Sequence, residues 1–173
     1  KAYGRFEGAN RKDFSDAKVM LQLKNYPRKM FNEVKIKDSS KYRYVRYISA
    51  DWFPGDIAEV AWYADTLGQT KLQGEFLSTL PYKGSRTVSG RSAMDGDPLT
   101  FFTSSEKPGW VGLDLNTPKQ VGSIRYTPRN DDNFVRVGDK YELFYFAADG
   151  WKSLGVKVAE ERKLIFNNVP SHA

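Results

Sequence analysis

Two adjoining stretches decide the fold of this chain: residues 92–102 (SAMDGDPLTFF) and residues 109–115 (GWVGLDL). The first has the residue types of a tight turn, because Asp starts a turn, Gly permits a positive φ angle and Pro fixes the exit. The second alternates apolar with other side chains, which predicts a half-buried strand. Its two faces would carry Val111, Leu113 and Leu115 on one side and Trp110, Gly112 and Asp114 on the other.

Similar alternating runs recur along the chain, separated by Gly, Pro, Asn and Asp turns. Strands are predicted at residues 5–7, 19–23, 31–36, 42–48, 57–63, 110–115, 121–126, 141–146, 151–154 and 164–166. No long helical period is present, and only residues 14–17 have the character of a short helical turn. Aromatic residues make up 14% of the 173 residues. We therefore expect an all-β protein with antiparallel sheets and negligible helix.

Composition narrows the possible functions. The chain has no cysteine, so it can form neither disulfides nor thiolate metal sites, and it has no apolar run of membrane-spanning length. It begins with Lys rather than Met, which indicates a piece of a longer chain. The net charge is +6, and the densest basic group is Lys35, Lys37, Lys41, Arg43 and Arg46. We interpret that group as a solvated face, with a surface for acidic polysaccharide or nucleic acid as the alternative, and we expect no nucleic-acid partner.

Three further stretches carry a family resemblance: residues 4–10 (GRFEGAN), 41–48 (KYRYVRYI) and 56–63 (DIAEVAWY). Together with the acidic turn and the strand after it, they resemble the discoidin family, which comprises the coagulation-factor C-type domains and their galactose-binding-like carbohydrate modules. The resemblance covers most of the chain. It implies a jelly-roll β-sandwich that binds a ligand and performs no catalysis.

The order of these stretches predicts one and a half to two units. Residues 1–65 resemble the C-terminal half of a discoidin unit, and residues 88–173 resemble a unit that lacks its closing strands. We interpret residues 66–87 between them as a linker and entry loop. Two arrangements remain open. Either the chain is cut from a longer one, or strands of the first segment complete the sheets of the second.

The residues give no support to catalysis. The single histidine is His172, next to the last residue, and without cysteine neither a Ser–His nor a Cys–His nucleophile can be assembled. Acidic pairs occur at Asp131–Asp132 and Glu160–Glu161, but neighbouring residues on a strand point to opposite faces. We expect no enzyme activity.

The acidic turn is a candidate calcium site. Asp95, Asp97 and Thr100 supply oxygen ligands of the kind that Ca²⁺ prefers. The resemblance adds the Ala93 carbonyl as a ligand, and it adds a glutamate from a closing strand, for which Glu59 is the matching position. The alternative is an acidic turn whose side chains cap backbone N–H groups.

A polar loop at residues 127–134 is the candidate ligand site. Its Arg129, Asn130, Asp132 and Asn133 have the donors and acceptors that bind sugar hydroxyls. An aromatic platform would come from Trp52, Phe53, Phe102 or Trp151, of which we favour Phe102 and Trp151. The alternative is a turn held by its own Asx hydrogen bonds.

The resemblance implies a non-catalytic carbohydrate-binding accessory module of a larger secreted, periplasmic or cell-surface protein. Its expected partners are a glycan, of galactose type or from a plant or host polysaccharide, and neighbouring domains of the same polypeptide. The alternative is a structural or docking module that braces a neighbouring catalytic domain and binds no glycan. Exposed aromatic loop tips would favour the first function, and a broad apolar sheet face would favour the second.

Overall fold

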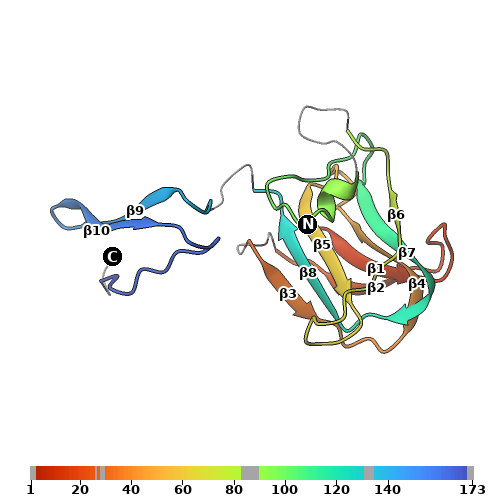
Figure 1. Cartoon of the computed structure of the whole chain (residues 1–173). Coiled ribbons are helices and arrows are strands. Elements are labelled where there is room, and N and C mark those ends of the chain that lie inside the picture. The colour runs from red at the N-terminus through yellow and green to blue at the C-terminus, as the bar shows by residue number, and fades with distance from the viewer. Residues whose placement is uncertain (1–2, 26, 28–29, 83–89, 131–134, 171–173) are drawn as a thin grey trace. The chain divides into compact units, whose positions relative to one another are not determined.

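The computed structural model describes residues 3–25, 27, 30–82, 90–130 and 135–170 (Figure 1). The chain divides into two compact units, Lys1–Asp131 and Asp132–Ala173. Both units are built from antiparallel strands, and the described residues contain no α-helix, only the 3-10 turn η1 (Gly90–Ala93). The all-β prediction is therefore confirmed.

The first unit is a sandwich of two antiparallel sheets (Figure 1). The larger sheet has the spatial order β2 (Lys18–Gln22), β1 (Arg5–Ala9), β4 (Lys41–Ile48), β7 (Trp110–Gln120) and β6 (Glu75–Ser78). The smaller sheet has the order β3 (Asn32–Lys35), β8 (Ser123–Pro128) and β5 (Ile57–Tyr63).

The core of this unit lies between the two sheets. Phe6, Val45 and Val111 of the larger sheet pack in one cluster with side chains of the smaller sheet such as Trp62 and Ile124. The core-facing side predicted for β7 is confirmed, because Val111, Leu113 and Leu115 all belong to this core. The strand is not half-buried, however, because Gly112 and Asp114 on its other face are buried too. Trp110 packs on the opposite face of the sheet, in a small cluster with Phe14 and Tyr44.

The outer face of the larger sheet carries a buried ion pair between two central strands. Glu7 of β1 and Arg46 of β4 are register partners. Arg46 Nη2 lies 2.7 Å from Glu7 Oε2, and Arg5 Nε lies 2.5 Å from Glu7 Oε1. The Arg46 guanidinium carbon is 4.0 Å from the centroid of the Phe14 ring, so the aromatic ring shields the ion pair from water.

The structure groups the strands differently from the predicted division into residues 1–65, 66–87 and 88–173. Strand β4 pairs with β1 on one side and with β7 on the other, and β8 lies between β3 and β5. Strands from both sides of the supposed linker thus share both sheets, as in the second arrangement left open above. Residues 66–87 also contribute strand β6, which pairs with β7 because Phe76 supplies an apolar side chain that packs against the core.

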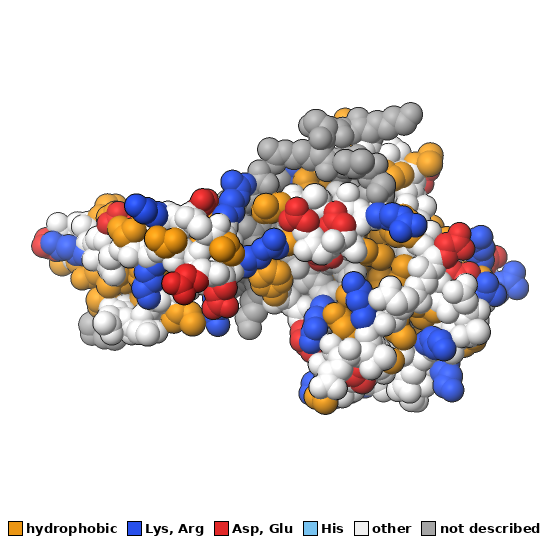
Figure 2. All heavy atoms as spheres, in the orientation of Figure 1, with side chains coloured by type: hydrophobic (Ala, Val, Ile, Leu, Met, Phe, Trp, Pro, Cys, Tyr) orange, Lys and Arg blue, Asp and Glu red, His pale blue; other side chains and the backbone are white. Residues whose placement is uncertain are grey.

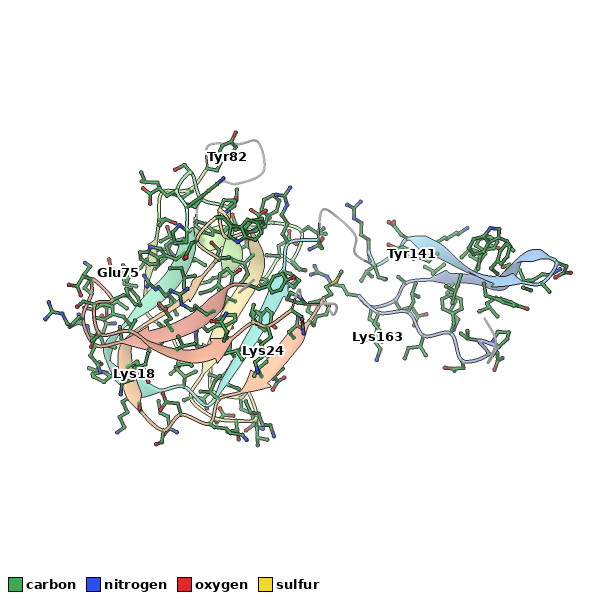
Figure 3. The ribbon with its side chains drawn as sticks, turned by 180° about the vertical axis from the view of Figure 1, so that it is seen from behind. Lys18, Lys24, Glu75, Tyr82, Tyr141 and Lys163 are labelled. Atoms are coloured by element: carbon green, nitrogen blue, oxygen red, sulfur yellow. The ribbon has the colours of Figure 1, made fainter. Side chains whose placement is uncertain are left out.

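The second unit is a hairpin of β9 (Lys140–Ala147) and β10 (Gly150–Val158). Tyr141, labelled in Figure 3, accepts a hydrogen bond from the Arg136 N–H at 2.7 Å. The prediction of a strand at residues 164–166 is wrong, because this segment is not assigned to a strand. Its Leu164 and Phe166 side chains instead line a hollow together with Tyr141 and Leu143 of β9.

Candidate ligand-binding site

An aromatic cleft of about 450 Å³ opens at one end of the first unit. It lies where β1 begins, β4 ends, β5 begins and β8 ends. Its aromatic walls are Tyr3, Tyr47, Trp52, Phe53 and Tyr126, and its charged groups are Asp56 and Arg129. Both the size and the mixture of many apolar with few polar groups are typical of small-molecule sites.

The aromatic side chains differ in how far they reach into solvent. Tyr47 and Tyr126 are buried and belong to the core, so they form the floor of the cleft. Trp52 is 59% exposed and packs edge-on against Phe53, with ring centroids 5.4 Å apart. The cleft therefore has a rigid aromatic floor and an accessible indole ring at its rim.

The polar part of the cleft is an ion pair with one unused acceptor. Arg129 Nη1 lies 3.0 Å from Asp56 Oδ2, and the guanidinium carbon of Arg129 stacks 4.2 Å from the centroid of the Phe101 ring. The second oxygen, Asp56 Oδ1, is buried and has no hydrogen-bond partner among the residues described. A buried acceptor without a donor is unfavourable, so this atom favours a ligand that brings a hydroxyl or an N–H group.

The loop between β4 and β5, which carries Trp52 and Asp56, is held by backbone contacts. Phe53 N–H donates to Ala50 O at 2.9 Å, and the Ser49 hydroxyl donates to Phe53 O at 2.6 Å. Gly55 has a φ of +91°, and a Cβ there would meet Gly109 O at 2.9 Å. The loop thus needs glycine at this position to present its side chains to the cleft.

The structure separates the predicted ligand residues. Arg129 lines the cleft, and Asn130 lies beside it in sequence with its Nδ2 donating to Pro98 O at 3.0 Å. The prediction that Phe102 forms an aromatic platform for a sugar is wrong, because its side chain is 0% exposed and belongs to the core. Trp151 lies in the second unit, where it packs against Phe146.

Two predicted ligand residues, Asp132 and Asn133, lie outside the described residues. Asp56 was missed altogether, and Trp52 and Phe53 were considered only as alternatives for the platform. The signal was present in residues 52–56 (WFPGD), where two adjacent aromatic residues precede a Pro-Gly turn and an acidic residue. Such a loop has no apolar alternation that would bury its aromatic side chains in a strand.

The candidate calcium loop, residues 93–100, is closed by its own side chains. The Thr100 hydroxyl lies 2.8 Å from Asp95 Oδ2, 3.0 Å from the Asp97 carbonyl and 3.2 Å from the Ser92 carbonyl. Asp97 Oδ1 accepts the Leu99 N–H at 3.0 Å, which is a capping contact of the kind considered as the alternative. The structure therefore brings Asp95 and Thr100 together and gives the Asp97 carboxylate a backbone partner.

Glu59 of β5 reaches the same loop. Its Oε1 accepts a hydrogen bond from the Gly96 N–H at 2.8 Å. Burial raises the pKa of Glu59 from its usual value to about 7, and a hydrogen bond with the nearby Asp95 carboxyl adds to the rise. Two carboxyl groups that face each other in this way are stabilised by a shared proton or by a cation.

The loop's donor set is made of oxygens, which suits a hard cation. Within the part of the chain that the structure describes, however, no group of three or more His, Cys, Asp or Glu side chains is placed to hold a metal ion. A cation bound here would therefore depend on Glu59, Asp95 and Thr100 together with backbone carbonyls.

Comparisons with protein-family models, with curated proteins and with solved structures find no match to this chain.

The described residues contain no helix with the length and apolar character needed to cross a membrane.

Proposed function

We propose that the first unit is a non-catalytic carbohydrate-binding module whose ligand site is the aromatic cleft. The observation that carries this proposal is the exposed Trp52 ring at the rim of a cleft that contains the unpaired Asp56 Oδ1. A sugar ring has an apolar C–H face that packs on an aromatic ring and hydroxyls that donate to a carboxylate. The discoidin resemblance supports the same function and a place within a larger secreted or surface protein.

The charges of the cleft favour a neutral sugar. Arg129 is held by Asp56 and by the Phe101 ring, so its charge is already compensated. The buried polar atom without a partner, Asp56 Oδ1, is an acceptor, so it favours a ligand that brings a donor. Galactose-type sugars with adjacent hydroxyls meet this requirement, with an affinity of about 0.1–1 mM, because few contacts must offset the desolvation of many hydroxyls.

Trp52→Ala should abolish glycan binding and leave the fold intact. The ring is 59% exposed, so its removal deletes the stacking surface and little of the core. Binding should weaken at least tenfold while Tm changes by less than about 3 °C. A glycan array identifies the ligand, and isothermal calorimetry with that ligand measures the change.

Tyr82→Ala is the matched control. Tyr82 (labelled in Figure 3) is also an exposed aromatic residue, and it does not line the cleft. Its replacement should leave glycan affinity unchanged. Equal affinity for the wild type and the Trp52 variant would contradict the proposed site, and an array on which the folded chain binds no glycan would contradict the proposed function.

Calcium binding at residues 93–100 is a further part of this proposal. Glu59, Asp95 and Thr100 are the side chains that would hold the ion, which would neutralise the facing carboxyl groups and fix the loop. The loop contacts β5, so the ion would act as a structural element of the sandwich.

The second unit favours a second candidate function, docking to a neighbouring domain. One face of the hairpin presents Phe144, Phe146, Trp151, Val156 and Val158, all of them exposed. Apolar side chains are visible on this hairpin in Figure 2. Contiguous exposed apolar surface is typical of an interaction surface.

Hydrogen exchange tests the docking function. A two-stranded hairpin is marginally stable by itself, so the β9 and β10 amides should exchange much faster than those of β4 and β7 in this chain alone. In a longer polypeptide or complex that covers the hairpin, these amides should become protected. Unchanged exchange of β9 and β10 in every such context would contradict docking.

A further inference from the structure

Exposed lysines gather at the end of the first unit that lies opposite the aromatic cleft. Strands β2 and β4 begin at this end and β7 ends there, since neighbouring strands of the larger sheet are antiparallel. The end of β3 joins them, because the Ile36 N–H donates to Gly122 O at 2.8 Å in the turn after β7. The exposed lysines of these strand ends, which we name the lysine patch, are Lys18, Lys35, Lys37, Lys41 and Lys119.

The two arginines of the densest basic group in the sequence do not belong to the patch. Arg43 Nε lies 2.9 Å from Asp114 Oδ1, and Arg46 pairs with Glu7, so both arginines are held on the outer face of the larger sheet. The basic residues that remain at this end are lysines, and folding adds Lys18 and Lys119 to them from distant parts of the sequence.

The acidic groups at this end do not cancel the patch. Its loops contain two aspartates, Asp38 and Asp65, and five lysines against two aspartates leave an excess of three positive charges. Glu33 lies two residues before Lys35, but it already pairs with Arg125 at 3.0 Å. The turn between β1 and β2 is neutral, because its two basic and two acidic side chains are Arg11, Lys12, Asp13 and Asp16.

Both aspartates use their oxygens to hold the backbone of their own loops. Asp38 Oδ1 accepts the Ser40 N–H at 2.8 Å, and Asp65 Oδ2 accepts the Thr70 N–H at 2.6 Å. Lys18 contributes to the lowered pKa of Asp38, after the hydrogen bonds that this carboxylate accepts, so part of its charge is compensated. The side chains of the patch lysines form no hydrogen bond or ion pair with any described residue, which leaves their ammonium groups available to an external anion.

The residue types of the patch distinguish among polyanions. Single-stranded nucleic acids bind where aromatic rings stack on the bases, and the described loops and strand ends around the patch carry no exposed aromatic side chain. Bidentate recognition of phosphates and of guanine depends on arginine, and the patch contains only lysine. Lysine ammonium groups bind sulfate or carboxylate as point charges, so the patch favours an anionic chain without flat bases.

The dimensions of the patch fit a single extended chain. Lys18 and Lys119 mark its two sides in the larger sheet, on β2 and β7, with β1 and β4 between them. Neighbouring strands lie about 4.8 Å apart, so this row of strand ends is about 15 Å long. A flexible linear polymer can follow such a row and contact several ammonium groups at once.

We infer that the lysine patch binds a linear anionic polysaccharide, whose sulfate or carboxylate groups contact the ammonium groups. Lys35, Lys37, Lys41 and Lys119 carry most of the attraction, since the charge of Lys18 is partly compensated by Asp38. This inference does not depend on glycan binding at the aromatic cleft, because the two sites lie at opposite ends of the sandwich.

Dextran sulfate and uncharged dextran, which share one backbone, test the inference on the whole chain. Fluorescence anisotropy of the labelled polymers measures binding, and dextran should bind at least a hundredfold more weakly than dextran sulfate. Affinity for dextran sulfate should fall roughly a hundredfold between about 50 and 200 mM NaCl, because each lysine contact releases counterions from the polymer. Carboxymethyl dextran, measured in parallel, identifies which anionic group is preferred.

Two double variants with the same change in net charge locate the site. Lys37→Gln/Lys119→Gln should weaken dextran sulfate binding about tenfold, because it removes two of the ammonium contacts. Lys24→Gln/Lys107→Gln is the matched control, with an effect below about twofold. Both control lysines are exposed and lie at the other end of the unit, Lys24 beyond the end of β2 (Figure 3) and Lys107 before β7 begins. Trp52→Ala should bind dextran sulfate as the wild type does, which separates the patch from the aromatic cleft.

Three outcomes would overturn the inference. Equal losses in the two double variants would show that the net charge of the chain, and not the patch, attracts the polymer. Dextran that binds as tightly as dextran sulfate would remove the role of the lysines. A DNA duplex that binds more tightly than both charged dextrans at the same salt concentration would make nucleic acid the partner instead.

Discussion

Arg46→Met should lower the free energy of unfolding by about 3–5 kcal/mol, because it leaves the buried Glu7 carboxylate with only part of its compensation. The side chain of Glu7 is 5% exposed, and its remaining partner would be Arg5. The variant also loses the stacking of the Arg46 guanidinium on Phe14. Urea unfolding followed by tryptophan fluorescence measures the change.

An exposed ion pair of the same chain provides the matched control. Arg11 and Asp13 are 3.4 Å apart, with side chains 67% and 58% exposed, so Arg11→Met should cost less than about 1 kcal/mol. The double variant Glu7→Leu/Arg46→Met should recover part of the lost stability, because no charge is then left buried. Equal losses for Arg46→Met and Arg11→Met would show that burial does not strengthen the Glu7 pair.

Glu59→Gln should remove a pH dependence of stability between about pH 4.5 and 7. The pKa of Glu59 is raised to about 7 in the folded chain, from an ordinary value of 4.5, so the folded state binds the proton more tightly than the unfolded state does. Stability from this group is therefore fully present below pH 4.5 and is lost as pH rises to about 7. The loss should be about 1–2 kcal/mol after allowance for screening by solvent.

Asp114 titrates in a separate pH window, because its pKa is lowered and not raised. Hydrogen bonds from Arg43 lower the pKa of Asp114, so that contribution is present at neutral pH and is lost only as pH falls below the ordinary value of 3.8. Melting curves of the wild type and of Glu59→Gln, recorded without calcium from pH 5 to pH 8, therefore isolate Glu59. A wild-type Tm that stays constant over this range would contradict the expected ionisation.

Calcium provides a second readout of the same residue. At pH 8, where Glu59 is ionised, millimolar Ca²⁺ should raise the Tm of the wild type by mass action. Glu59→Gln and Asp95→Ala should each lose this rise. Mg²⁺ is the control ion, since it demands a stricter geometry than Ca²⁺. Equal Tm values with and without Ca²⁺ would leave residues 93–100 as an acidic turn.

The sequence predicts the sheets well because strand alternation is a local property. In β5, residues two apart share a face, and the observed burial alternates with this period from Ala58 to Tyr63. In β4 and in residues 111–115 of β7 most residues are buried on both faces of the sheet, so burial there does not alternate. Strand β6 was missed because its four residues lie within a Gly- and Ser-rich segment and are stabilised by pairing with β7, a distant partner. Strand register and strand pairing depend on tertiary contacts, so the local alternation of the sequence cannot predict them.

The candidate site was predicted less well for the same reason. Arg129 was identified from a polar loop, but its partner Asp56 lies 73 residues away in sequence. Phe102 was mistaken for a platform, since an aromatic residue beside a turn resembles an exposed one until its neighbours are known. Only the folded chain shows that Phe102 pairs with Ile57 in the interior while Trp52 stays at the surface.

The placement of β8 between β3 and β5 has a consequence for how the chain is made. Among the described residues, β3 and β5 each pair with no strand other than β8. Strand β4 gains its second neighbour only when β7 is present, and Arg43 of β4 then forms an ion pair with Asp114, 71 residues further on. A ribosome has to release both late strands before the sandwich can close. Until then, β3 and β5 lack the strand β8 with which they pair, although β1, β2 and β4 can already pair with one another, and this reliance on distant contacts implies slow folding.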